Sequence, residues 1–153
     1  MTFFCVDVET DGPAPGLYSM LSIGVVAVRP TLDDTFYVEM QPLDDAGSLP
    51  EALAISGLEL GELKANATPP QDAMASLAEW VETTSKGRPA FISDNPAFDF
   101  SFVNWYFHRF EIKNPFGWSA RRIGDLYAGM QRDTRAQWKH LSLIHISEPT
   151  RPY

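Results

Sequence analysis

The N-terminal part of the chain alternates between apolar and polar positions in a way that predicts three β-strands. We expect these strands near residues 2–8, 21–28 and 35–39, because each run is rich in β-branched and aromatic residues. Residues 11–16 are rich in glycine and proline and predict a turn between the first two strands. The pattern therefore favours an antiparallel three-strand meander.

The periodicity then changes to that of helices. A short helix is predicted over residues 50–55, and a longer one after Thr68, where apolar residues recur at i, i+3, i+4 and i+7. Residues 89–93 form a short apolar run typical of a buried strand, and a helix that is apolar on nearly all sides is expected from Phe98. Residues 124–127 are predicted to end a strand and begin a helix. This order predicts an α/β three-layer fold.

Composition narrows the class of protein. With 153 residues, 44% of them hydrophobic, the chain can bury the core of one domain. A formal charge of −8 argues against a protein that coats nucleic acid with a broad basic face, although an enzyme that holds a strand end through metal ions is compatible with it. Cys5 is the single cysteine, which is the usage of a reducing compartment. We see no signal peptide or membrane-spanning segment, and we expect a cytoplasmic protein.

Asp7 and Glu9 form the most informative pair of residues. They lie at i and i+2 within the first predicted strand, so both side chains point to the same face. Two neighbouring carboxylates at the end of an apolar strand repel each other unless a divalent cation lies between them. A site for a hard metal ion is therefore the leading interpretation, and a pair of solvated acids on an edge strand is the alternative.

Asp99 is the candidate acid in the second half of the chain. It follows a buried strand and a polar exit, and it lies in the first turn of a helix, where the helix dipole favours a carboxylate. Open α/β sheets bind ligands at such strand ends. Helix capping is the structural alternative for Asp99, and Asp94 competes for the functional role. We prefer Asp99 because local backbone donors can satisfy Asp94.

Two segments resemble the motifs of a known family. Residues 6–12 and 93–99 are similar to the first and second exonuclease motifs of the DEDD superfamily, the ribonuclease T and polymerase-proofreading type of 3′–5′ exonuclease. Residues 52–57 resemble the helix-then-glycine element of that family, and the whole resemblance covers about residues 2–130. It implies a ribonuclease-H-like fold, in which a mixed sheet of the meander and parallel strands is flanked by helices.

The resemblance also implies a reaction and a set of ligands. The chain would hydrolyse phosphodiester bonds at the 3′ end of single-stranded RNA or DNA, with RNA as the expected substrate. Asp7 would bridge two divalent cations, Mg²⁺ or Mn²⁺, and Glu9 and Asp99 would complete their coordination. The three acids are thus the predicted catalytic and metal-binding residues. Many relatives are dimers, so a homodimer is one expected arrangement.

Family analogy suggests the residues that contact the substrate. Thr10 would meet the terminal nucleotide, and Leu21 or Phe102 could pack on its base. For Leu21 and Phe102, ordinary core packing is the alternative, and the residue types alone favour it.

The third motif of the family is missing from this sequence. That motif places a histidine or tyrosine shortly before a final aspartate on a C-terminal helix, but His140 is followed five positions later by His145, and no aspartate follows Asp133. Residues 141–151 resemble a translated sequencing adapter. We therefore expect an exonuclease domain over residues 1–140 that is truncated before its last helix, a non-native tail over residues 141–153, and little or no turnover by this polypeptide.

Two other classes of function stay open at the level of the sequence. Phosphatases that form an aspartyl-phosphate also begin with an apolar strand that ends in Asp-x-Asp, which differs from Asp7-Val8-Glu9 by one methylene group. Such an enzyme also requires a later lysine motif, which is not convincing here. The other class is a non-catalytic nucleic-acid-binding protein on the same fold.

Overall fold

The computed structural model describes residues 1–138, and His140, His145 and the predicted tail lie outside this range. The described part contains five strands and five helices. In chain order they are β1 (Thr2–Thr10), β2 (Met20–Ala27), β3 (Thr35–Glu39), α1 (Pro50–Ser56), α2 (Leu60–Asn66), α3 (Pro70–Thr84), β4 (Pro89–Ser93), α4 (Pro96–Arg109), β5 (Ala120–Arg122) and α5 (Ile123–Gln131).

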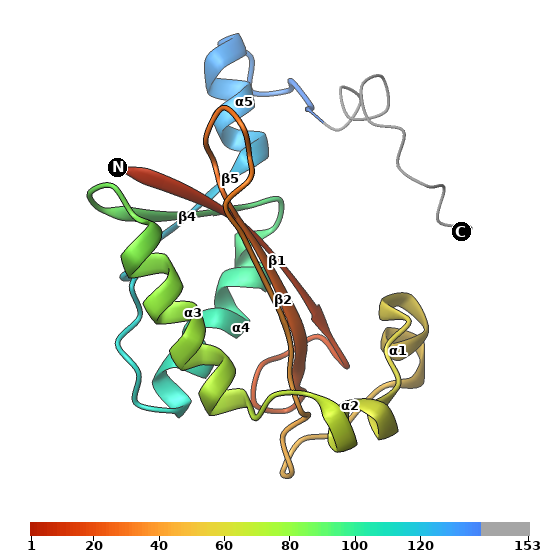
Figure 1. Ribbon diagram of the computed structural model, residues 1–153. Coiled ribbons are helices and arrows are strands. Elements are labelled where there is room, and N and C mark those ends of the chain that lie inside the picture. The colour runs from red at the N-terminus through yellow and green to blue at the C-terminus, as the bar shows by residue number, and fades with distance from the viewer. Residues whose placement is uncertain (139–153) are drawn as a thin grey trace.

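The strands form one mixed sheet in the order β3-β2-β1-β4-β5. β1, β2 and β3 pair antiparallel, whereas β4 pairs parallel with β1 and β5 pairs parallel with β4. This arrangement confirms the predicted meander joined to parallel strands. It also puts β1, which carries Asp7 and Glu9, at the centre of the sheet (Figure 1).

Alternation along β1 separates the two faces of the sheet. Phe4, Val6 and Val8 are buried and belong to the hydrophobic core, whereas Cys5 and Asp7 point to the opposite face and are more exposed. The same alternation continues across β2, because Phe4, Val6 and Val8 pair with buried apolar residues there. Asp7 and Glu9 are therefore carried on the face of the sheet that does not hold the main core.

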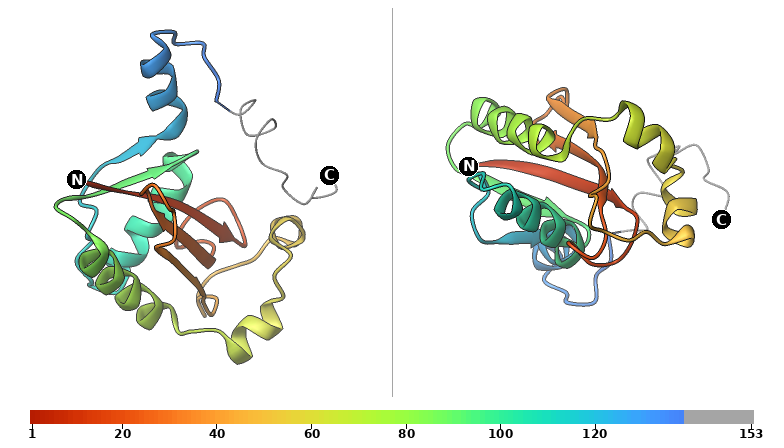
Figure 2. Two further views of the ribbon diagram at one scale, coloured as in Figure 1. Left: turned by 45° about the horizontal axis from the view of Figure 1, so that its top comes forward. Right: turned by 90° about the horizontal axis from the view of Figure 1, so that it is seen from below.

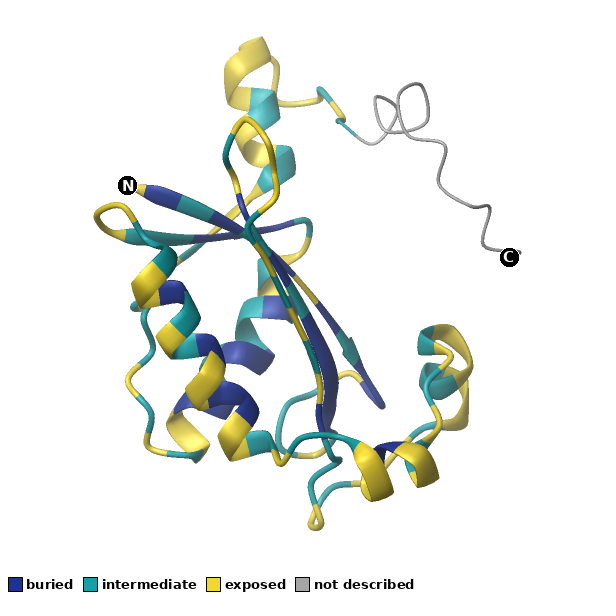
Figure 3. Cartoon of the chain, in the orientation of Figure 1, coloured by how far each residue is buried: buried dark blue, intermediate teal, exposed yellow. Residues whose placement is uncertain are grey.

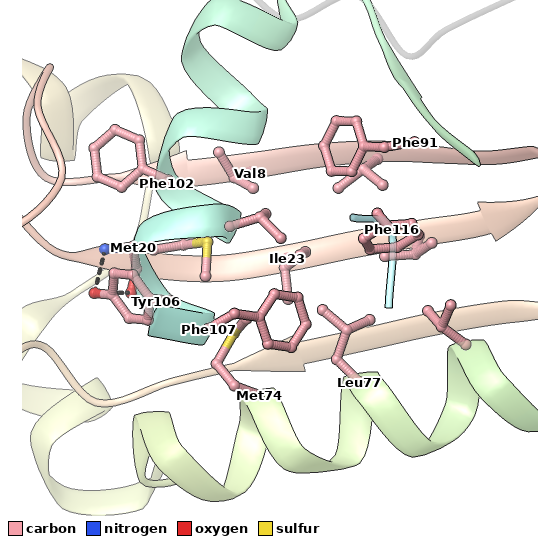
Figure 4. Packing of buried hydrophobic residues seen from close by; sticks show 14 of the residues in the cluster. Val8, Met20, Ile23, Met74, Leu77, Phe91, Phe102, Tyr106, Phe107 and Phe116 are labelled. Atoms are coloured by element: carbon pink, nitrogen blue, oxygen red, sulfur yellow. Dashed lines mark hydrogen bonds between the residues drawn. The ribbon is translucent and has the colours of Figure 1, made fainter. Parts of the chain in front are cut away.

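Helices α3 and α4 cover the core face side by side (Figures 1 and 2). α3 buries the periodic positions Met74, Leu77 and Val81, as predicted, and α4 contributes Phe102 and Phe107 to the same cluster (Figure 4). Figure 3 shows the buried residues concentrated on the sheet and on the inner sides of these two helices. The prediction that α4 is apolar and buried on nearly all sides is confirmed, because five of its fourteen residues are buried and only Ala97, His108 and Arg109 are exposed.

The shorter helices lie away from this core. α1 and α2 lie on the other side of β1 and β2 from α3 and α4 (Figures 1 and 2). α1 begins at Pro50, as predicted, and ends at Ser56. It is capped by Gly57, whose left-handed backbone (φ 69°) favours glycine. The predicted strand-to-helix change near residues 124–127 corresponds to β5 and α5. Among residues 1–138, no helix has the length and apolar character needed to cross a bilayer.

Candidate active site

Asp7 and Glu9 line a small cavity beside the C-terminal half of β1. The cavity has a volume of about 250 Å³. Its lining residues are Asp7, Glu9, Ser22, Gly24, Tyr37, Ser56 and Leu58. They come from β1, β2, β3 and the end of α1, so the cavity is framed by the meander and the short helix. The strand periodicity that predicted a shared face for the two acids is confirmed here.

Asp99 approaches the same region from α4. It lies in the first turn of the helix, where its N–H donates to the Asn95 carbonyl at 3.0 Å, and it is 5% exposed. Burial raises the pKa of Asp99 above its ordinary value, and the negative charge of Asp7 raises it further. The chain therefore brings together two carboxylates that are far apart in sequence, at the junction of β1 and α4.

Ser93, the last residue of β4, lies close to Asp99. Within the described residues its buried hydroxyl has no hydrogen bond of ordinary geometry, but it is close enough to Asp99 to oppose part of the rise in pKa.

The three acids interact in pairs. Asp7 shares a cavity with Glu9 and repels Asp99, and both Asp7 and Asp99 raise the pKa of the Cys5 thiol after burial does. In residues 1–138, no set of three or more His, Cys, Asp and Glu side chains has the geometry of a metal site. Asp7 is nevertheless the common member of both pairs. Carboxylate oxygens suit a hard divalent cation, which would also relieve the repulsion between them.

An apolar groove adjoins the acids on the other side of Glu9. It has a volume of about 400 Å³. Its lining residues are Val8, Glu9, Thr10, Gly12, Pro13, Leu49, Glu51, Ala52, Ile55 and Phe98. Thr10, predicted to meet the terminal nucleotide, lies in this wall, and its hydroxyl donates to the Gly12 carbonyl at 2.8 Å. Glu9 lines both the groove and the acid cavity, so the two hollows adjoin the same side chain.

Two of the predicted substrate contacts are wrong. Leu21 and Phe102 are both 0% exposed, so neither presents a surface on which a base could pack. Leu21 is buried because β2 is apolar on both faces near its start, and Phe102 lies one turn too far along α4. The aromatic residue that reaches the groove is Phe98, whose ring packs against Phe102 with the ring centroids 5.1 Å apart. The signal in the sequence that could have pointed to Phe98 was its position directly before Asp99.

Asp94, the competing acid, is engaged elsewhere. Its Oδ1 accepts a hydrogen bond from Trp138 Nε1 at 3.3 Å, and its carbonyl accepts one from Arg122 Nε at 3.1 Å. Asp94 therefore joins the end of β4 to β5 and to the segment after α5. These contacts give Asp94 a structural role at the edge of the site.

A buried polar network holds the elements of the site in place. The Tyr106 hydroxyl of α4 accepts a hydrogen bond from the Met20 N–H at 2.7 Å (Figure 4). Asp11, which is 1% exposed, accepts one from the Ser19 N–H at 2.5 Å, and its carbonyl accepts one from Leu49 N–H at 2.8 Å. Burial raises the pKa of Asp11. The network thus ties α4 and the entry to α1 to the loop between β1 and β2.

Comparison with known proteins decides the family. An Escherichia coli protein named 3′-5′ DNA exonuclease Cap18 is 37% identical over 153 aligned residues, which cover 98% of this chain and 79% of that protein. The chain belongs to the DEDD superfamily of 3′–5′ exonucleases. Ribonuclease T of Shewanella denitrificans is 30% identical over 122 residues, covering 72% of this chain and 54% of the relative. No protein-family model matches.

Solved structures confirm the fold of this DEDD chain. E. coli exonuclease I, solved with a dT13 oligonucleotide, superposes with a TM-score of 0.70 at 19% identity, over 85% of this chain and 29% of that one. The predicted ribonuclease-H-like fold is thus confirmed. The chain spans about half the length of ribonuclease T and less than a third of exonuclease I.

Membership in the superfamily also sets the class of chemistry. DEDD exonucleases are hydrolases of phosphodiester bonds, and membership implies dependence on divalent metal ions. It decides against the phosphatase interpretation. The alignment with the Cap18 protein includes most of residues 141–153. The prediction that this segment is a non-native tail is not tested by the described residues and stays a prediction.

Proposed function

We propose that this chain is a 3′–5′ exonuclease domain that binds the 3′ end of single-stranded DNA, with Asp7, Glu9 and Asp99 as its catalytic metal ligands. The observation that supports this most is the approach of the buried Asp99 to Asp7, since burial and a like charge both disfavour two adjacent carboxylates. Such an arrangement is typical of a site that binds cations.

Mg²⁺ or Mn²⁺ is the cation that fits these ligands, and we propose two ions per site. Bound ions of this kind supply an activated water and neutralise charge on the phosphate and the leaving oxygen. The chain's own part is to hold the carboxylates. Asp7 would hold the ions together with Glu9 and Asp99, and Ser93, which lies close to Asp99, would help to orient that carboxylate.

The apolar groove fits the terminal base. Its walls combine the half-buried Phe98 ring with Leu49 and Ile55, and it adjoins the carboxylates through Glu9. An aromatic ring beside aliphatic side chains binds any base by stacking, which suits an enzyme that removes nucleotides irrespective of sequence. Thr10 would contact the same nucleotide from the wall that it forms.

DNA is the substrate that the comparisons favour. The relative that shares 37% identity over most of its length carries the name of a DNA exonuclease, whereas the ribonuclease T relatives match over about half of theirs. RNA, which the sequence resemblance favoured, is the second candidate. The direct test is competition between DNA and RNA oligonucleotides of the same sequence for the metal-loaded protein.

We expect slow turnover by the present polypeptide. Its sequence contains no aspartate after Asp133, where the family's third motif would place the fourth metal ligand. We propose that residues 1–140 are the exonuclease domain and that residues 141–153 are not native to it. Sequencing the source gene beyond codon 140, without transposase tagging, tests this assignment directly.

The experiment for the function uses a 5′-labelled single-stranded oligonucleotide with Mn²⁺. We expect metal-dependent binding of the strand and slow shortening from its 3′ end, both abolished by Asp7→Asn. Asp45→Asn is a matched control, because Asp45 is an exposed acid that pairs with Arg109 outside the acid cavity. Binding without any shortening, equally strong in Asp7→Asn, would favour the non-catalytic nucleic-acid-binding alternative.

Two further properties belong to this proposal. We expect a cytoplasmic protein, because Cys5 is a free thiol in the described structure and suits a reducing compartment. We also expect that a homodimer forms, by analogy with the family. Sedimentation of the purified chain measures the second property, and a monomer at micromolar concentration would contradict it.

A further inference from the structure

The floor of the acid cavity is a row of three residues across the meander. The strand register sets Asp7 opposite Gly24, and Gly24 opposite Tyr37. The next row along the sheet consists of Glu9, Ser22 and Glu39. Both rows lie on the face opposite the main core. Gly24 therefore occupies the central position between a candidate metal ligand and an exposed aromatic ring.

Neither the backbone nor the packing requires glycine at position 24. Gly24 is not among the glycines with positive φ in the described chain. A Cβ built on it would meet only Cδ2 of Tyr37, at 3.9 Å, which is an ordinary van der Waals contact. Glycine within a strand lowers stability relative to alanine, and it often marks a close approach by a ligand. What Gly24 provides here is open space beside Asp7.

Tyr37 forms one wall of that space. Its side chain is 64% exposed, yet its hydroxyl donates to Glu39 Oε1 at 3.0 Å, which fixes the tip of the ring over the second row. Ser56 and Leu58 close the cavity from the end of α1. An exposed tyrosine that is held in place beside an open floor is suited to contact a flat or ring-shaped ligand.

The position of Glu9 indicates which part of a nucleotide enters. This step rests on the proposed function. Glu9 lines both the apolar groove and the acid cavity. A nucleotide whose base lies in the groove and whose phosphate lies at the carboxylates has its sugar next to Glu9, because the sugar joins the base to the phosphate. We propose that the cavity formed by Gly24 and Tyr37 receives the 2′ edge of the terminal sugar and determines which sugars are accepted.

The test measures binding of two 5′-labelled strands that differ only in the last sugar, which is 2′-deoxy or 2′-O-methyl, in the presence of Ca²⁺. We expect the wild-type protein to bind the deoxy strand about tenfold more tightly. The methoxy group adds two heavy atoms in place of a hydrogen, and even one carbon too many in a close-fitting pocket has an effect of this order. Tyr37→Ala removes the wall and should bring the ratio of the two affinities to about twofold or less. Thr35→Ala, at an exposed position on the same face of β3, should leave the ratio unchanged.

Gly24→Ala separates a binding role from a structural one. Filling the floor should weaken binding of the deoxy strand about tenfold, while the melting temperature stays equal or rises because alanine is the better strand residue. Opposite changes in stability and binding support the proposal. A lower melting temperature with unchanged binding would make Gly24 structural and overturn its role.

The controls distinguish failure of this inference from failure of the proposed function. If the wild-type protein binds the strand and Asp7→Asn does not, but Tyr37→Ala and Gly24→Ala both keep the wild-type ratio and affinity, the sugar site alone is refuted. If the wild-type protein binds neither strand with metal present, the proposed function falls and the sugar site falls with it.

Discussion

Replacement of Tyr106 by phenylalanine tests the buried network that holds α4 against the meander. Tyr106 is 0% exposed, and its hydroxyl accepts a hydrogen bond from the Met20 N–H at 2.7 Å. Burial raises the pKa of Tyr106 above its usual range, so the hydroxyl stays protonated throughout the measurement. Tyr106→Phe keeps the ring in the core and removes one atom.

The expected loss of stability follows from the Met20 N–H, which the substitution leaves without a hydrogen-bond partner. Met20 is also 0% exposed, so its N–H loses its partner without gaining water. A buried donor left without a partner destabilises a protein by about 1–3 kcal/mol. For a chain of this size, about 2 kcal/mol corresponds to a decrease in melting temperature of about 4–8 °C.

The assay is thermal unfolding followed by circular dichroism, with Tyr37→Phe as the matched control. Tyr37 loses the same atom, but its hydrogen bond to Glu39 is exposed, so that change should lower the free energy of unfolding by no more than about 0.5 kcal/mol. If the two variants melt within about 1 °C of each other, the buried hydrogen bond contributes nothing specific and the argument fails.

Three further predictions concern the site. Phe98→Ala should weaken binding of a single-stranded oligonucleotide about tenfold or more, because stacking on an aromatic ring stabilises a bound base by about 1–3 kcal/mol. Fluorescence anisotropy measures the affinity, and an affinity equal to that of the wild-type protein would exclude the groove as the site of the terminal base. Because the folded-state pKa of Asp99 is raised, the metal-free folded protein binds more protons than the unfolded chain, and its free energy of unfolding should fall as the pH rises from the unfolded-state pKa through the folded-state pKa. Asp99→Asn should flatten this dependence in urea titrations at successive pH values. An unchanged slope would contradict the assignment. Mn²⁺ or Mg²⁺ should accelerate alkylation of Cys5, because the charges of Asp7 and Asp99 raise the pKa of its thiol and a bound cation offsets those charges. Mass spectrometry measures the rate of alkylation, and a rate that does not depend on the metal would place the ions elsewhere.

The sequence was sufficient to predict the parts of the fold that carry strong periodicity. β3 and β4 have the predicted bounds, and α3 buries the apolar positions that its period indicated. The bounds of α2 and β5 could not be predicted from the sequence, because both elements are short and mostly polar. α2 is seven residues long and buries Leu63 alone, and β5 has three residues with two exposed arginines, so neither has an apolar pattern to detect.

The candidate site was predictable only in part. The shared face of Asp7 and Glu9 follows from the geometry of a strand, and the position of Asp99 follows from the first turn of a helix. The substrate contacts did not follow, because residue type does not indicate which side of α4 faces the groove. Leu21 lies at the start of β2, where both faces of the strand are apolar. The role suggested for Gly24 depends on strand register, which three separate segments determine together.

Binding of Mn²⁺ to the purified chain tests the central claim most directly. Electron paramagnetic resonance counts bound ions in the wild-type protein, in Asp7→Asn and in the Asp45→Asn control, and melting temperatures are measured in the same solutions. We predict that the wild-type protein and the control bind two ions and gain thermal stability with Mn²⁺, and that Asp7→Asn loses both effects. Equal Mn²⁺ binding and equal stabilisation in wild type and Asp7→Asn would contradict a metal site at Asp7, Glu9 and Asp99.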